Sequence, residues 1–245
     1  MARGPRRPGR PALATLTVTL TVIVGGVLAG SAAAGANESL GTTGLAGNGI
    51  VRVSQEAPSV AVVAWSAPVD GRVAIVVSNS TTQPVRVRKV VATATASSGT
   101  RSAKASTRTV VPRVLQPGEQ GLGEIRFRAN RVRFDDTLAF DVTTRPVRTT
   151  DPVPLASGGF ALSPPGTGDV AQTLDLVVTN DTTRAIDGRI ALRVVCLNEA
   201  GVPTTAAAGA VKHAKLAPGA TTPASVDFSL LCPVYVVGAE GRPAR

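Results

Sequence analysis

VVSNSTTQPV (Val76–Val85) and VVTNDTTRAI (Val177–Ile186) are nearly matching ten-residue stretches in one chain of 245 residues. In both, two apolar β-branched residues lead into a short polar cluster, after which an apolar run resumes. Asn79 and Asn180 can bond their own backbone two residues on and tolerate the left-handed conformation, so each is typical of a corner between strands. The stretches predict one strand-and-corner unit built twice.

The offset between the two asparagines, 101 residues, recurs elsewhere in the chain. LQPG at 115–118 matches LAPG at 216–219, and Phe127 matches Phe228. Pro-Gly suits the centre of a tight turn, because Pro fixes φ and Gly takes a positive φ. Matches at one fixed offset indicate an internal duplication of a unit of about 90 residues, longer than a solenoid repeat.

Both copies consist of short β-branched runs bounded by Gly, Pro, Asn and Asp, with no sustained helical period after the first 40 residues. The pattern predicts an all-β chain of two tandem Ig-like antiparallel β-sandwich domains after an N-terminal signal or transmembrane helix. Trp65 ends an apolar run and is expected in the first core. The predicted parts are a signal peptide or signal anchor (1–36), a basic first β-sandwich (37–146), a Pro-rich linker (147–157), a second β-sandwich (158–240) and a tail (241–245).

The order of these motifs resembles that of small extracellular Ig-like β-sandwich modules of bacterial envelope proteins, of the FxLYD type or CARDB-like. The resemblance covers Val73–Asp141 and Leu174–Val237 and lies in turn and core motifs. It implies a spacer, adhesion unit or accessory binding domain rather than an enzyme.

The first 36 residues have the pattern of an export signal. Arg3, Arg6, Arg7 and Arg10 precede an uncharged stretch that closes on small residues, with Ala34-Gly35-Ala36 fitting a cleavage site. An uncleaved anchor is the alternative, because the run is long enough for the roughly 20 residues that span a bilayer. The protein is expected to be extracellular or in the cell envelope.

Cys196 and Cys232 are the two cysteines of the chain. An exported chain meets an oxidising compartment, so the pair predicts a structural disulfide. The chain-entropy model assigns a crosslink across such a loop about 3–4 kcal/mol.

The sequence offers little for catalysis, a metal or a cofactor, and none of these is expected. His213 is the single histidine and lies between lysines in AVKHAKL, which predicts a surface position. Asp135-Asp136 is the adjacent acidic pair and is interpreted as a charge-balanced turn. A nucleophile motif such as G-x-S-x-G is absent from the sequence.

Positive charge is concentrated in the first unit. Residues 60–149 hold 14 Lys and Arg against 6 Asp and Glu, whereas residues 150–245 hold 7 against 8. Alternation with Ile125 and Phe127 predicts that Arg126 and Arg128 share a solvent face. The predicted anion-binding residues are Arg86, Arg88, Lys89, Arg126, Arg128, Arg131 and Arg133. The alternative is an Arg-rich solvated surface without a partner.

The sequence therefore predicts an exported, non-enzymatic envelope protein whose first domain contacts an acidic wall polymer or anionic lipid headgroups. Nucleic acid is not expected, because aromatic residues for base stacking make up 3% of the chain. The alternative function is a secreted protein-interaction factor, such as a protease inhibitor or assembly partner, that uses loops or sheet edges.

Overall fold

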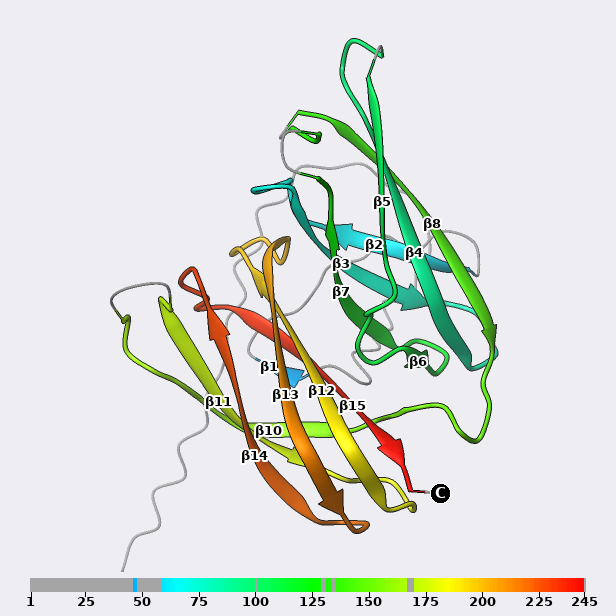
Figure 1. Cartoon of the computed structure of the whole chain (residues 1–245), viewed down its shortest axis with the longest axis vertical. Helices are drawn as coiled ribbons and strands as arrows, with labels where there is room; N and C mark the ends of the chain where they lie inside the picture. The colour runs from blue at the N-terminus through cyan, green and yellow to red at the C-terminus, as the bar shows by residue number, and fades with distance from the viewer. Residues whose placement is uncertain are drawn as a thin grey trace, which may run out of the picture. The chain divides into compact units, whose positions relative to one another are not determined.

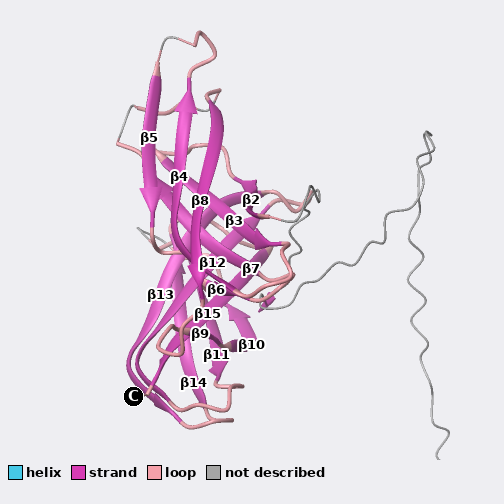
Figure 2. Cartoon of the chain, turned by 90° about the vertical axis from the view of Figure 1, so that its right-hand side faces the viewer, coloured by secondary structure: helices cyan, strands magenta, loops and turns pink. Residues whose placement is uncertain are grey.

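The computed structural model describes residues 46–47, 59–99, 101–128, 131–133, 135–166 and 170–244. In these residues every regular element is a β-strand, and the strands pair antiparallel (Figure 2), which confirms the predicted all-β class. This part of the chain holds no helix with the length and apolar character needed to cross a membrane. The predicted signal or anchor (1–36) lies outside the described residues.

The N-terminal half (59–146) consists of two sheets that face each other across an apolar core. Its strands are β2 (Val60–Trp65), β3 (Arg72–Asn79), β4 (Val85–Thr95), β5 (Ser102–Thr107), β6 (Val114–Leu115), β7 (Gln120–Arg126) and β8 (Thr137–Pro146). One sheet has the order β2-β3-β7; in the other, β4 pairs with β5, β6 and β8. Alternate residues of β3, such as Val73 and Ile75, pack against Val90 and Ala92 of β4.

The C-terminal half (147–244) has the same two-layer construction (Figure 1). Its strands are β9 (Val153–Pro154), β10 (Ala156–Leu162), β11 (Gln172–Thr179), β12 (Ile186–Leu197), β13 (Pro203–Leu216), β14 (Thr221–Phe228) and β15 (Tyr235–Pro243). The order β10-β11-β14 faces the order β1-β15-β12-β13, with the short β1 (Ala46–Gly47) at the edge and β9 also paired to β15. The segment predicted as a linker, 147–157, thus contains β9 and the start of β10.

The two matching asparagines close the same corner in each half. Asn79 is fully buried, and its Nδ2 donates to the carbonyl oxygens of Gln83 (2.9 Å) and Leu115 (3.0 Å). Asn180 is also fully buried and donates to Arg184 (2.8 Å) and Leu216 (3.1 Å). The repeated Asn motif is thereby joined to the repeated Leu-x-Pro-Gly motif.

These asparagine side chains also accept hydrogen bonds from the backbone two residues on, as predicted. The amides of Thr81 and Thr182 donate to the respective Oδ1 atoms at 3.1 and 3.2 Å. Neither asparagine uses the left-handed conformation that it tolerates, and the glycines of the facing turns take it. Gly118 (φ 81°) and Gly219 (φ 77°) each donate an amide hydrogen to the backbone oxygen of the matching asparagine at 2.7 Å.

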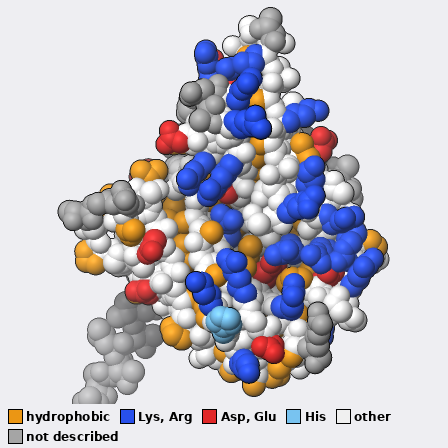
Figure 3. Space-filling view, in the orientation of Figure 1, with side chains coloured by type: hydrophobic (Ala, Val, Ile, Leu, Met, Phe, Trp, Pro, Cys, Tyr) orange, Lys and Arg blue, Asp and Glu red, His pale blue; other side chains and the backbone are white. Residues whose placement is uncertain are grey.

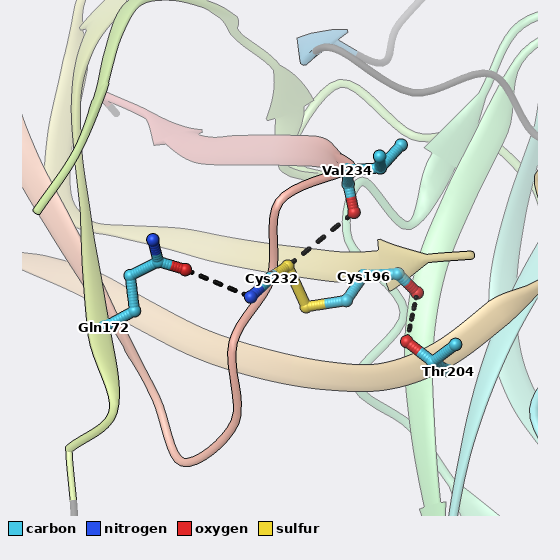
Figure 4. The surroundings of a disulfide bond; sticks show 5 residues. All are labelled: Gln172, Cys196, Thr204, Cys232 and Val234. Atoms are coloured by element: carbon cyan, nitrogen blue, oxygen red, sulfur yellow. Dashed lines mark hydrogen bonds between the residues drawn. A yellow bond between two sulfur atoms is a disulfide. The ribbon is translucent and has the colours of Figure 1, made fainter. Parts of the chain in front are cut away.

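The predicted disulfide is confirmed. Cys196 at the end of β12 and Cys232 before β15 are bonded, with their Cα atoms 5.4 Å apart (Figure 4). The Cys232 amide donates to Oε1 of Gln172 at 3.0 Å, and the Thr204 hydroxyl donates to the Cys196 carbonyl at 3.2 Å. The bridge fixes the loop after β14 to the central strand of the larger sheet.

The expectation that Trp65 lies in the first core is wrong. Its side chain is 42% exposed, because Trp65 is the last residue of β2, which lies at the edge of its sheet. Its ring lies beside that of Phe140 in β8, with the centroids 5.1 Å apart and the ring planes tilted by 52°.

A third apolar cluster joins the two halves through the outer faces of their sheets. Val76 of β3 and Leu122 of β7 point away from the first core and pack with Val195 of β12 and Val236 of β15. These strands are therefore buried on both faces, and none of these four side chains is more than 3% exposed. At Gly238 of β15 the approach is so close that an added Cβ would overlap the backbone oxygen of Val111.

We expect Asn79→Ala to lower the free energy of unfolding by about 2–3 kcal/mol, because the buried carbonyl of Leu115 and the partly buried carbonyl of Gln83 lose their donor. Chemical denaturation monitored by far-UV circular dichroism would measure the change. Asn198→Ala is the matched control, since the side chain of this exposed asparagine accepts from the nearby amides of Ala200 and Val202. This substitution should cost less than about 1 kcal/mol. Equal losses for the two variants would contradict the corner's long-range role.

We expect Gly238→Ala to destabilise the contact between the halves by about 1–3 kcal/mol, because the methyl group meets rigid backbone. Gly158→Ala in β10 is the control, since nothing lies within 4 Å of the added Cβ. Limited proteolysis at the chain between β8 and β10, together with the thermal midpoint, would reveal the loosening. A proteolysis rate unchanged from the unsubstituted protein would contradict this interface.

Candidate functional site

The structure divides the predicted anion-binding residues into two groups. Arg86, Arg88 and Lys89 lie near the start of β4, whereas Arg126 ends β7 opposite Arg72 at the start of β3. The strands β4 and β7 belong to different sheets and do not pair. Because β3 runs from Arg72 towards the corner at which β4 begins, the groups lie towards opposite ends of the N-terminal half.

Arg86 takes part in an ion-pair cluster rather than facing solvent alone. Its guanidinium and that of Arg145 in β8 both bond Asp151, whose side chain is 2% exposed. The Arg148 amide donates to the other carboxylate oxygen at 2.8 Å. Asp151 follows β8, so this cluster fixes the segment between the halves to the first half.

The environment of Asp151 favours its charged form. Burial acts to raise the pKa of this carboxyl, but the hydrogen bonds from Arg145, the Arg148 amide and Arg86, with the charge of Arg86, together hold the pKa below its ordinary value. The three donors thus outweigh the cost of removing the carboxylate from water.

Arg126 lies beside a buried carboxylate, and its own side chain is 66% exposed. It is paired with Glu124, two residues earlier in β7, and the second Glu124 oxygen lies 3.9 Å from Nη1 of Arg193 in β12. Glu124 is 7% exposed and Arg193 is 8% exposed. This arrangement brings charged groups of both halves together beside the apolar contact.

The group at the end of β7 is the more open of the two. Arg128, Arg131 and Arg133 are exposed, and no acidic partner of their side chains occurs among the described residues. The prediction that Arg126 and Arg128 are both on a solvent-facing side agrees with their exposure. The residues 129–130, which separate them from Arg131, lie outside the described residues.

The acidic pair Asp135-Asp136 forms a turn, as predicted, although with a different charge partner. Asp136 is 9% exposed and accepts from the Arg133 amide at 2.9 Å. Its charge is balanced by the Arg101 side chain at 3.0 and 3.2 Å. Asp135 is exposed beside it.

His213 lies on the exposed side of the edge strand β13, as predicted. It has a positive φ of 55° and sits with Lys212 in a bulge opposite β12. The described residues contain no group of three or more His, Cys, Asp or Glu side chains that could hold a metal ion.

Arginines of both halves also surround a cavity of about 400 Å³ between them. Its lining comes from the segment Thr109–Arg113, from Pro152 and from strands β12, β13 and β15. Arg113 and Glu240 cross this junction: the Arg113 amide and Nε donate to the two carboxylate oxygens of Glu240 at 2.9 and 2.8 Å. Glu240 is 2% exposed, so its charge depends on this partner.

The space-filling view shows the extent of the basic surface (Figure 3). Lys and Arg side chains are spread over the face in view and are densest around the end of β8, beside β6. This densest region belongs to the first half, where the sequence also concentrates the positive charge.

Sequence reasoning missed the contributions of Arg113, Arg193 and Glu240. A signal for Arg193 exists, since it is the one charged residue in the apolar run IALRVVCL (Ile190–Leu197). Its partner Glu124 lies 69 positions earlier, and no local pattern connects the two.

No protein-family model matches the chain, and no curated protein matches it significantly.

We expect Asp151→Asn to lower the free energy of unfolding by about 2–3 kcal/mol near neutral pH, because two arginines lose their buried counter-charge. A carboxyl whose folded pKa is lowered stabilises the protein above its unfolded value of about 3.9, and this contribution is lost as the pH falls through the folded pKa. Denaturation midpoints from pH 7 to pH 3 should therefore converge for the two proteins in acid. A difference that is constant down to pH 3 would contradict the charge-based role.

Proposed function

We propose that the protein is an exported, non-enzymatic module of two tandem Ig-like β-sandwiches that binds an acidic polymer of the cell envelope. The observation that carries the proposal is the open group of arginines at the end of β7, defined by Arg72, Arg126, Arg128, Arg131 and Arg133. Four of these side chains, all but Arg126, have no acidic partner in the described part of the chain.

A polyanion suits this group better than a small ligand does. The arginines are distributed along a strand end and the connection that follows. A flexible polymer can contact such dispersed charges in turn, and the attraction acts over a Debye length of about 8–10 Å at physiological salt. The predicted export signal is consistent with a wall polymer as the anion.

The resemblance to bacterial Ig-like modules supports a binding role rather than catalysis. A two-layer β-fold with rigid strands and exposed loops presents side chains without needing a reactive centre. The disulfide suits an oxidising compartment outside the cytosol.

We expect Arg128, Arg131 and Arg133 replaced together by Glu to weaken binding to a soluble phosphodiester or uronic-acid polymer by at least about tenfold at low salt, since each charge near an anionic surface contributes about 1 kcal/mol. Raising the salt should weaken the unsubstituted protein's binding in the same direction. Lys212→Glu with Lys215→Glu is the matched control, because both residues are exposed in the second half.

Binding that is insensitive to both salt and the arginine variant would contradict the proposal and favour a protein partner at loops or sheet edges. Binding to anionic vesicles without binding to the soluble polymers would instead identify lipid headgroups as the ligand. Fluorescence anisotropy with labelled polymer and vesicle sedimentation distinguish these outcomes.

A further inference from the structure

The junction cavity contains a buried arginine whose hydrogen bonding is incomplete. Arg193 lines the cavity and its side chain is 10% exposed. Its Nε atom is buried and has no hydrogen-bond partner among the described residues. The carboxylate oxygen of Glu124 lies 3.9 Å from Nη1 of Arg193, which is beyond hydrogen-bond length.

Glu124 cannot fully neutralise Arg193, because it also pairs with Arg126. Burial lowers the pKa of Arg193; the charge of Glu124 opposes this effect, and the smaller effect of the Arg126 charge adds to it. The Arg193 guanidinium is therefore only partly neutralised, and its Nε has no acceptor within the described part of the chain; both are costly for a buried charge. An anion in the cavity would supply both.

The other charged groups of the cavity leave a positive surplus. Its lining includes four arginines, Arg113, Arg189, Arg193 and Arg242, and two carboxylates, Asp187 and Glu240, which leaves a formal charge of +2. Glu240 is bonded to Arg113 through both oxygens, which orients that guanidinium rather than opposing a ligand. The surplus charge is matched by a dianion.

A bulge in β12 shapes this cavity. Between Ile186 and Ile190 the strand holds two more residues than the facing stretch of β15, from Pro243 to Gly241. Asp187, Gly188 and Arg189 fall in this stretch, and all three line the cavity. Bulges redirect side chains and are common beside functional sites.

We propose that this cavity binds a dianionic phosphate group, either free phosphate or a phosphomonoester, with Arg193 as the buried ligand and Arg189 and Arg242 at the rim. Planar guanidinium groups match phosphate oxygens in geometry and charge. The volume of about 400 Å³ leaves room for a small organic group attached to the phosphate. This inference is independent of the polymer-binding surface at the end of β7.

Isothermal titration calorimetry and thermal unfolding at constant ionic strength test the site, with inorganic phosphate, glycerol 3-phosphate, dimethyl phosphate and acetate as probes. We expect the first two to bind and, at ten times their Kd, to raise the thermal midpoint by about 3–6 °C. The singly charged diester and acetate should bind several-fold more weakly. Equal shifts from all four probes, or no shift from phosphate, would overturn the proposal.

Arg193→Met should weaken phosphate binding by about tenfold to a hundredfold, the value of one to two charge-assisted hydrogen bonds. Its stability without phosphate should fall only modestly, because the buried Glu124 keeps Arg126 as its partner. Arg128→Met is the control outside the cavity and should bind phosphate normally. Normal phosphate binding by Arg193→Met would overturn the assignment.

Arg189→Met with Arg242→Met keeps the test decisive if Arg193→Met fails to fold, since both rim side chains are exposed. This variant should also lose phosphate affinity, and unchanged affinity would overturn the site. Polymer binding by the group at the end of β7 should persist in both variants. Loss of polymer binding alone, in the Arg128, Arg131 and Arg133 variant, would bear only on the proposed function.

Discussion

The apolar contact between the outer faces of two sheets is the constraint on which the arrangement of the charged groups depends. Val76 and Leu122 on one side and Val195 and Val236 on the other remove from water the faces that a solitary sandwich would expose. Each fully buried Val or Leu side chain contributes about 1.5–3 kcal/mol relative to exposure. This contact brings Glu124 beside Arg193 and Arg113 beside Glu240, and the junction cavity exists because of it.

The duplicated corner shows how far local sequence reasoning reaches. A motif that combines Asn with Leu-x-Pro-Gly at a fixed offset predicted the corner, the turn and the all-β class. The structure adds that the two motifs bond each other, through Nδ2 of Asn79 and the Leu115 carbonyl. That link spans 36 residues, so it depends on the folding of the whole unit and not on local preference.

The interface was beyond the same reasoning for a physical reason. Alternation identifies an inward face, but strands buried on both faces give continuous apolar runs that look alike whichever partner covers them. RVAIVV in β3 and RVVCL in β12 are such runs. The exposure of Arg126 and Arg128 could be predicted from the alternation along their strand. Their separation from the arginines of β4 could not, because it depends on the order of strands in the two sheets. The pairing of Arg86 with Asp151 likewise required the path of the segment between the halves.

The contact between the halves is also head to tail: the β2-β3-β7 sheet of the first copy meets the opposite sheet, around β12 and β15, of the second. Such heterologous contacts can repeat from one unit to the next and generate open filaments unless the arrangement closes into a ring. In the second copy, the positions 101 residues after Ala74 and Leu122 hold Asp175, which is exposed, and Pro223, which lies on the edge strand β14. A charge on the sheet face and a proline on its edge disfavour a third unit. At these two positions the second copy thus lacks the apolar side chains through which the first copy makes this contact.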